Sequence, residues 1–101
     1  MEHYLIRITY AAHAWDAWLH EPHSCESKVK ILAEKLGGKL LQYWWSRGEF
    51  DKLLILQMPN RATMESFSEY LNSMGGFLDY RVTPLLLDEE AMKAIHAGLK
   101  P

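Results

Sequence analysis

The spacing of apolar residues switches between two periods along the chain, and the order of these switches limits the fold more than any other feature. Apolar and polar residues alternate over residues 3–10, which is typical of a half-buried strand. Over residues 11–19 the apolar positions recur every three or four residues and predict a short helix. Pro22 interrupts this helix, and a second one is expected from a cap at Ser24 to Gly37-Gly38.

The later part of the chain contains the same two periods. In chain order, its elements are strands over residues 39–46 and 50–58 joined at Arg47-Gly48, a helix capped by Asn60, a strand over residues 77–87 and a helix capped by Asp88. In the order β-α-β-β-α-β, right-handed crossovers place both main helices on one side of a four-stranded antiparallel sheet. We therefore predict one ferredoxin-like α+β domain over residues 1–101, with an extra C-terminal helix.

The alternation also divides the strand residues between the two faces of the sheet. The side chains expected beneath the helices are Tyr4, Ile6, Ile8, Leu41, Tyr43, Trp45, Leu54, Leu56, Leu78, Tyr80 and Val82. Lys52 falls on the same apolar face, so we expect its side chain either to snorkel at the strand end or to lie beside a bulge. We expect Gly48 to be required by the turn, and Asp51 to be structural or to form the rim of a site.

The opposite face of the sheet carries too many large apolar side chains for a surface that remains in water. These are expected to be Leu5, Leu40, Trp44, Leu53 and Ile55. Burying a few hundred Å² of such surface contributes several kcal/mol, at about 25 cal/mol per Å². A two-fold symmetric dimer is the most common way to bury it. We therefore predict a homodimer through this open face, and the alternative is a monomer with a solvated sheet.

Composition excludes several classes of partner. The chain is 49% hydrophobic and 24% charged, with a formal charge of −2 and no basic block, so we expect neither nucleic acid nor a membrane as a partner. No apolar run approaches the roughly 20 residues of a membrane span, and the first residues lack the pattern of a signal peptide. The single cysteine, Cys25, fits a reducing compartment, so a cytoplasmic protein is expected.

Three short motifs, taken together, are similar to the GYD-domain family. They are residues 36–40 (LGGKL), 47–51 (RGEFD) and 83–86 (TPLL), and Phe50 stands where the motif that names the family usually has tyrosine. The resemblance covers roughly residues 3–97 and implies a dimeric α/β-barrel of ferredoxin-like subunits. It implies no particular activity, because related barrels include sensors, cofactor-free oxygenases, isomerases and haem proteins.

Residues 13–25 hold the residue types used in acid–base or metal chemistry, and they depart from the family's usual pattern. His13 lies three residues before Asp16 and His20 four residues after it, so either histidine would meet the carboxylate on a helix as a base with its orienting group. The alternative is an exposed helix face. His23 and Cys25 are further metal-ligand types, but no paired metal motif is present, and we expect neither a metal nor a cofactor.

Aromatic residues and arginines supply the candidate ligand-binding positions. The residues expected to line a pocket between helix and sheet are Trp15, Tyr43, Trp44 and Trp45. Ordinary core and interface packing is the alternative for the four tryptophans of the chain, Trp15, Trp18, Trp44 and Trp45. Arg7 and Arg81 share the open face, either as an anion site or as ion-pair partners of aspartates across an interface.

Three functions are compatible with these patterns. The first is a small-molecule-binding dimeric barrel with an aromatic-lined pocket, which takes a small apolar or aromatic ligand. The second is a cofactor-free enzyme that transfers protons on, isomerises or oxygenates an aromatic or enolic substrate, with His13 or His20 as base and Arg7 or Arg81 stabilising the anion. The third is a structural or interaction module, which predicts a sheet face packed without a void.

Overall fold

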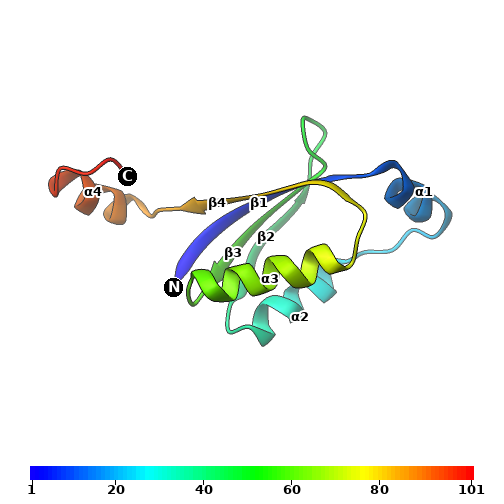
Figure 1. The fold of residues 1–101 in the computed structure, drawn as a ribbon, viewed down its shortest axis with the longest axis horizontal. Coiled ribbons are helices and arrows are strands. Elements are labelled where there is room, and N and C mark those ends of the chain that lie inside the picture. Colours follow the sequence, from blue (N-terminus) through cyan, green and yellow to red (C-terminus); the bar gives the residue numbers. More distant parts are fainter.

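The computed structural model describes residues 1–101 and contains four strands and four helices. In chain order they are β1 (Glu2–Tyr10), α1 (Ala12–His20), α2 (Glu26–Lys35), β2 (Lys39–Trp45), β3 (Lys52–Met58), α3 (Arg61–Ser73), β4 (Phe77–Leu85) and α4 (Asp88–His96). The strands form one antiparallel sheet in the order β2-β3-β1-β4, and α2 and α3 lie against the same face of it (Figure 1). The predicted ferredoxin-like α+β fold with an additional C-terminal helix is confirmed.

The hydrophobic core lies between this face of the sheet and the two helices. Its fully buried apolar side chains are Tyr4, Ile6, Ile8, Val29, Ala33, Leu54, Leu56, Met58, Met64, Phe67 and Leu71. The strand members follow the alternation of β1 and β3, and the helical members recur every three or four residues. The two periods that predict the helices and strands therefore also predict which face of each element packs in the core.

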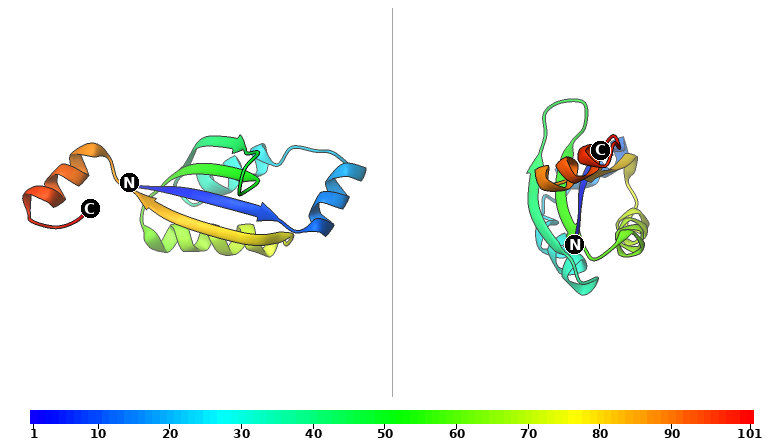
Figure 2. Two further views of the ribbon diagram at one scale, coloured as in Figure 1. Left: turned by 90° about the horizontal axis from the view of Figure 1, so that it is seen from above. Right: turned by 90° about the vertical axis from the view of Figure 1, so that its left-hand side faces the viewer.

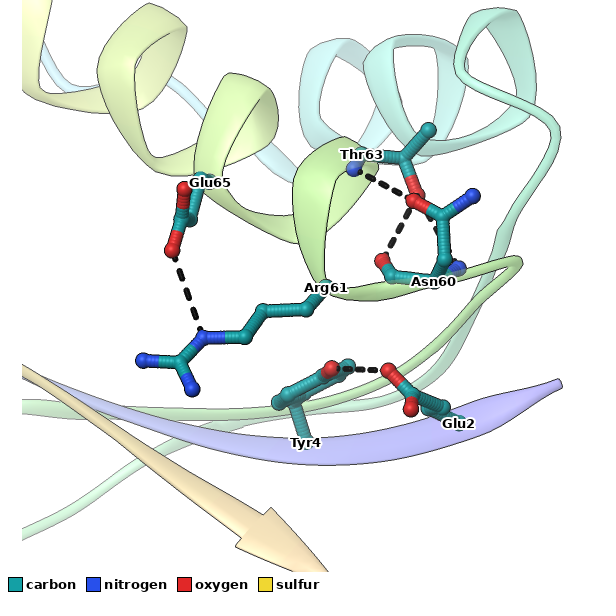
Figure 3. Close-up of polar contacts among 6 residues, drawn as sticks. All are labelled: Glu2, Tyr4, Asn60, Arg61, Thr63 and Glu65. Carbon is teal, nitrogen blue, oxygen red and sulfur yellow. Dashed lines mark hydrogen bonds and ion pairs between the residues drawn. The ribbon is translucent and has the colours of Figure 1, made fainter.

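Helix α3 begins at a complete capping box. The Oδ1 of Asn60 accepts a hydrogen bond from the backbone N–H of Thr63 at 2.9 Å, and the Oγ1 of Thr63 accepts one from the backbone N–H of Asn60 at 3.3 Å (Figure 3). Two of the donors that a helix leaves free at its start are thereby satisfied. Arg61 and Glu65, which are one turn apart at the start of α3, form an exposed ion pair. The cap predicted at Asn60 is confirmed, whereas those predicted at Ser24 and Asp88 are wrong, because the cap positions of α2 and α4 are Cys25 and Leu87.

Helix α2 is followed by two glycines, and each position requires glycine for a different structural reason. Gly37 has a φ of +81°, in the left-handed region that stops a helix. Gly38 is limited by space instead, because a Cβ there would lie 2.4 Å from the carbonyl oxygen of Gln57 and 2.5 Å from the Sδ of Met58. The chain therefore passes from α2 into β2 against the backbone of β3, with no room for a side chain.

The loop between β2 and β3 is wider than the predicted two-residue turn. Trp44 lies opposite Leu53, whereas a turn at Arg47-Gly48 would place it opposite Asp51. The difference of two residues keeps Tyr43, Trp44 and Trp45 on their predicted faces. The role expected of Gly48 in the turn is wrong, because its φ is not positive and a Cβ would find its nearest neighbour 3.8 Å away.

Asp51 fastens this loop to the end of β1. Its backbone N–H donates to the carbonyl oxygen of Ile8 at 2.8 Å, and its Oδ2 accepts a hydrogen bond from the backbone N–H of Tyr10, also at 2.8 Å. The structural role predicted for Asp51 is confirmed.

Each edge strand contains a bulge that moves one leucine away from its predicted position. In β2 the register shifts between Leu40 and Gln42, so Leu40 packs against the core and Leu41 is exposed, the reverse of the prediction. In β4 the register shifts opposite Thr9 and Tyr10, and Leu78, predicted beneath the helices, is 72% exposed. Alternation alone does not reveal such an extra residue, which explains both errors.

Helices α1 and α4 stand at opposite ends of the domain, clear of the layer formed by α2 and α3 (Figures 1 and 2). Neither contains a buried residue, and Leu19, the last apolar position of the predicted first helix, is 75% exposed. The radius of gyration is 15.3 Å, compared with about 13 Å for a compact chain of 100 residues. None of the helices has the length and apolar character needed to cross a membrane.

Candidate functional site

A cavity of about 370 Å³ lies at the end of the sheet where α1 leaves β1. Its volume is within the range of small-molecule sites, about 300–1,000 Å³. Its apolar and aromatic wall is made by Ile8, Tyr10, Ala14, Ala17, Trp18, Val29, Leu54, Leu71, Met74 and Phe77. Because these residues come from α1, α2, α3 and three strands, the cavity depends on the whole fold rather than on one loop. We call it the helix-side cavity.

The amine of Lys52 lies inside an aromatic enclosure at the wall of this cavity. Its Nζ is 4.1 Å from the ring centre of Trp45 and 4.7, 5.1 and 5.2 Å from those of Tyr43, Trp18 and Tyr10. Such distances allow cation–π attraction. The side chain is only 2% exposed, and Lys52 pairs regularly with Trp45 on the covered face. Both expectations for it, snorkelling and a position beside a bulge, are therefore wrong.

Lys52 is buried without a carboxylate partner. Its only hydrogen-bond partner is the hydroxyl oxygen of Tyr43, 2.5 Å away, and the two ion pairs of the chain lie elsewhere. Burial lowers the pKa of Lys52 from 10.5 to about 8, and the nearby Cys25 partly opposes this decrease. Burial also raises the pKa of Tyr43 to about 12 and raises that of Tyr10 further. At neutral pH the site therefore holds an ammonium group beside un-ionised phenols.

The other titratable groups that line the helix-side cavity are also basic, apart from a thiol. They are Lys28, His13, His23 and Cys25, and no aspartate or glutamate lines the cavity. An apolar cavity whose charged groups are all of one sign has a field that favours ligands of the opposite sign.

The candidate acid–base residues are not brought together as a pair. All three residues are exposed, but only His13 lines the helix-side cavity, and His20 and Asp16 lie outside it. His20 contacts the backbone carbonyl oxygen of Asp16 through its Nδ1, at 2.8 Å, and not the carboxylate. No group of three or more His, Cys, Asp or Glu side chains is placed to hold a metal ion.

The predicted ligand-binding aromatics are divided between the two faces of the sheet. Tyr43 and Trp45 enclose the Lys52 amine, and Trp15 lies beside Trp45 with ring centres 5.8 Å apart. Trp44 is 61% exposed and lies on the open face, opposite Leu53.

Arg7 and Arg81 are direct partners across β1 and β4. They line a separate hollow of about 200 Å³ with Asp79, whose carboxylate lies 2.9 Å from Arg81. This hollow is on the open face, so within one chain the arginines and His13 do not share a site.

The sequence patterns miss most of the wall of the helix-side cavity. Trp18, Tyr10 and Phe77 were not among the expected ligand-binding residues, although Trp18 and Tyr10 are in edge-to-face contact with ring centres 4.8 Å apart. Lys52 is missed as well, although the sequence contains an indication of its role. A lysine within an otherwise apolar strand face must be buried, displaced or functional, and here it is buried at the cavity.

Comparison with known proteins identifies a family for the chain. No similar protein was found among the curated proteins compared with the chain. The family model described as GYD domain matches residues 4–95, which include the cavity, the Lys52 enclosure and the loop that Asp51 fastens. By this match over nearly its whole length, the chain belongs to the GYD domain family.

Proposed function

We propose that this protein binds a small, largely apolar molecule in the helix-side cavity. The observation that carries the proposal is the cavity of about 370 Å³, walled by apolar and aromatic side chains and containing a few convergent polar groups. A module that only holds subunits together needs no such void. The proton-transfer enzyme expected from His13 and Arg7 would need these two groups in one place, and the chain places them on different faces.

The wall chemistry favours a planar ligand. Tyr10, Trp18 and Phe77 present ring faces and edges, and rings pack best against other rings in offset or edge-to-face arrangements. An aromatic ligand of one or two rings is smaller than the cavity of about 370 Å³ and fits inside it.

Binding is tested with two naphthalene probes, 2-naphthoate and 2-naphthalenemethanol, by isothermal titration and by protein amide chemical shifts. We expect at least one probe to bind saturably at up to millimolar concentration and to shift amides of α1 and the start of α2. Ala17→Trp, which fills the cavity from α1, is expected to abolish binding. Ala12→Trp, on the same helix but outside the cavity, is the control and should bind as the wild type does. Absence of binding by both probes, or undiminished binding by Ala17→Trp, would contradict the proposal.

We further propose that two chains form a homodimer through the open face of the sheet. The chain has an accessible surface of 7072 Å², whereas a monomeric protein of 11.8 kDa typically exposes about 5,900 Å². The excess is larger than the about 800 Å² that each partner buries in a standard interface. Leu5, Leu53 and Ile55 lie side by side at the centre of the face, with Trp44 at its margin.

The dimer is tested by light scattering on the full chain. We expect a mass of twice 11.8 kDa at micromolar concentration. Ile55→Asp, at the centre of the open face, should give monomers, because it would bury an unpaired charge. Ile31→Asp makes the same change on the exposed side of α2 and should leave the dimer intact. A wild-type monomer, or a dimeric Ile55→Asp variant, would contradict the interface.

A further inference from the structure

We propose that the helix-side cavity selects a ligand with a single anionic group, such as an aromatic carboxylate or an enolate, and that the ammonium of Lys52 is its counter-charge. The inference rests on the proposed binding function and adds the chemical class of the ligand. It depends on three features of the cavity, namely an unpaired buried cation, the sign of the surrounding charges and the extent of the polar region.

The first feature is the unpaired cation. Buried charges in proteins are normally paired, because leaving one without a partner costs several kcal/mol. Lys52 is 2% exposed, forms no ion pair and uses its Nζ for one hydrogen bond, to Tyr43. An ammonium has three donors, so donor capacity remains for a ligand that enters the cavity.

The second feature is the sign of the charges around Lys52. Lys28 and His23 from the α2 side and His13 from α1 line the same cavity. No carboxylate lines the cavity, and Asp51 accepts a hydrogen bond from the backbone N–H of Tyr10. Lys28, His13 and His23 are exposed, as is Glu26 at the start of α2, so Lys52 is the one buried charge on the wall. Cys25 and the phenol of Tyr10 are the groups on the wall that can become anions, and burial raises the pKa of Tyr10. The field inside the cavity therefore favours an incoming anion over a neutral molecule or a cation.

The third feature is the extent of the polar region. Beyond Lys52 the inner wall consists of apolar side chains, including Ile8, Leu54 and Leu71, which are all buried in the core. These offer nothing to solvate a second charge or a polar sugar, because desolvated polar groups need a partner. One anionic group at one end of an apolar, aromatic body is the ligand shape that satisfies both the lysine and the rest of the wall.

The aromatic rings around Lys52 fit this role. They hold the cation in place through their negative ring faces. They do not neutralise it, so the charge remains available to a carboxylate. Because the amine is already desolvated and positioned, a bound anion would meet a charge that needs little reorganisation.

The test compares 2-naphthoate with 2-naphthalenemethanol, which share the ring system and differ in charge. For the wild type at pH 7 we expect the carboxylate to bind at least about tenfold more tightly, as for a hydrogen bond to a charged group. Lys52→Met should lose this preference while it still binds the alcohol. Lys30→Met removes the same charge from an exposed position of α2 that does not line the cavity, and it should keep the preference.

A second measurement needs no variant. As pH rises above about 8, Lys52 loses its proton, so the affinity for 2-naphthoate should fall while that for the alcohol stays constant. Equal affinity for the two probes in the wild type, or a preference that survives Lys52→Met, would overturn the inference and leave the binding function in place. If neither probe binds, the proposed function itself fails.

Discussion

The Nζ of Lys52 lies 2.5 Å from the hydroxyl oxygen of Tyr43, on the covered face of the sheet. Burial moves the two groups in opposite senses, since it lowers the pKa of Lys52 to about 8 and raises that of Tyr43 to about 12. The amine therefore gives up its proton first, and the phenol accepts the hydrogen bond from the ammonium at neutral pH. The contact between Lys52 and Tyr43 is therefore a hydrogen bond from a charged donor to a neutral acceptor, and not an ion pair.

Replacing Lys52 by methionine should stabilise the fold at pH 7 by about 1–2 kcal/mol, because an apolar side chain of similar length avoids the burial of an unpaired charge. In the wild type the folded pKa is about 8 and the ordinary value is 10.5, so the unfolded chain binds more protons between these values. Wild-type stability should therefore rise with pH in that window.

The pH effect is measured as the difference between wild type and Lys52→Met in urea unfolding at pH 8 and 9.5. The wild type should gain about 1–2 kcal/mol relative to the variant over this interval. The raised pKa values of Tyr10 and Tyr43 act in the opposite sense above about pH 10 and are common to both proteins. A difference that does not change with pH would show that Lys52 is not buried as a cation.

Substitution of Gly38 by alanine should destabilise the domain by about 2–3 kcal/mol, since the new Cβ would overlap the backbone of Gln57. Gly48→Ala is the matched control, because a Cβ there meets nothing closer than 3.8 Å. Its effect should be within about 0.5 kcal/mol. Thermal unfolding measures both, and a control as destabilised as Gly38→Ala would contradict the described loop.

Loss of the Asp51 carboxylate should release the β2–β3 loop from the end of β1. Asp51→Ala removes the acceptor for the backbone N–H of Tyr10 and should cost about 1–3 kcal/mol, because a part-buried donor is left unpaired. Asp51→Asn keeps an acceptor oxygen and should recover part of this loss. Glu49→Ala, an exposed acid in the same loop, serves as the control and should be nearly neutral in chemical unfolding.

The cap of α3 should contribute about 1 kcal/mol to the stability of the domain, as side-chain caps usually do. Asn60→Ala removes an acceptor for the N–H of Thr63. Asn72→Ala makes the same change at an exposed position inside α3, where alanine is the better helix former. Equal losses in the two variants, measured by urea unfolding, would show that the capping box does not stabilise the helix.

The sequence predicts the fold well because its information is periodic and local. The alternation of Tyr4, Ile6 and Ile8, the cap at Asn60 and the glycines after each helix each specify an element without knowledge of its neighbours. Their order then selects the topology. The two bulges escape this reasoning, because the position of an extra residue depends on pairing between strands that are far apart in the chain.

The candidate site is predicted less well, since it is formed where three helices and three strands meet. The tryptophan-rich composition indicates an aromatic wall, but only the packing of α1 on β1 brings Trp18 to Tyr10. It is also the packing that leaves His20 in solvent while His13 faces the cavity. Residues from one pattern in the sequence are thus sorted to different environments by contacts that the pattern does not contain.

The irregular edge strands limit how chains can associate. A sheet is extended by a further strand only where its outermost strand offers an even row of donors and acceptors. Here β2 and β4, the two outermost strands, each contain a bulge, and Pro84 in β4 has no N–H to offer. Sideways growth into a continuous ribbon or fibril is therefore discouraged at both margins, and the broad face is left as the better surface for contact between copies.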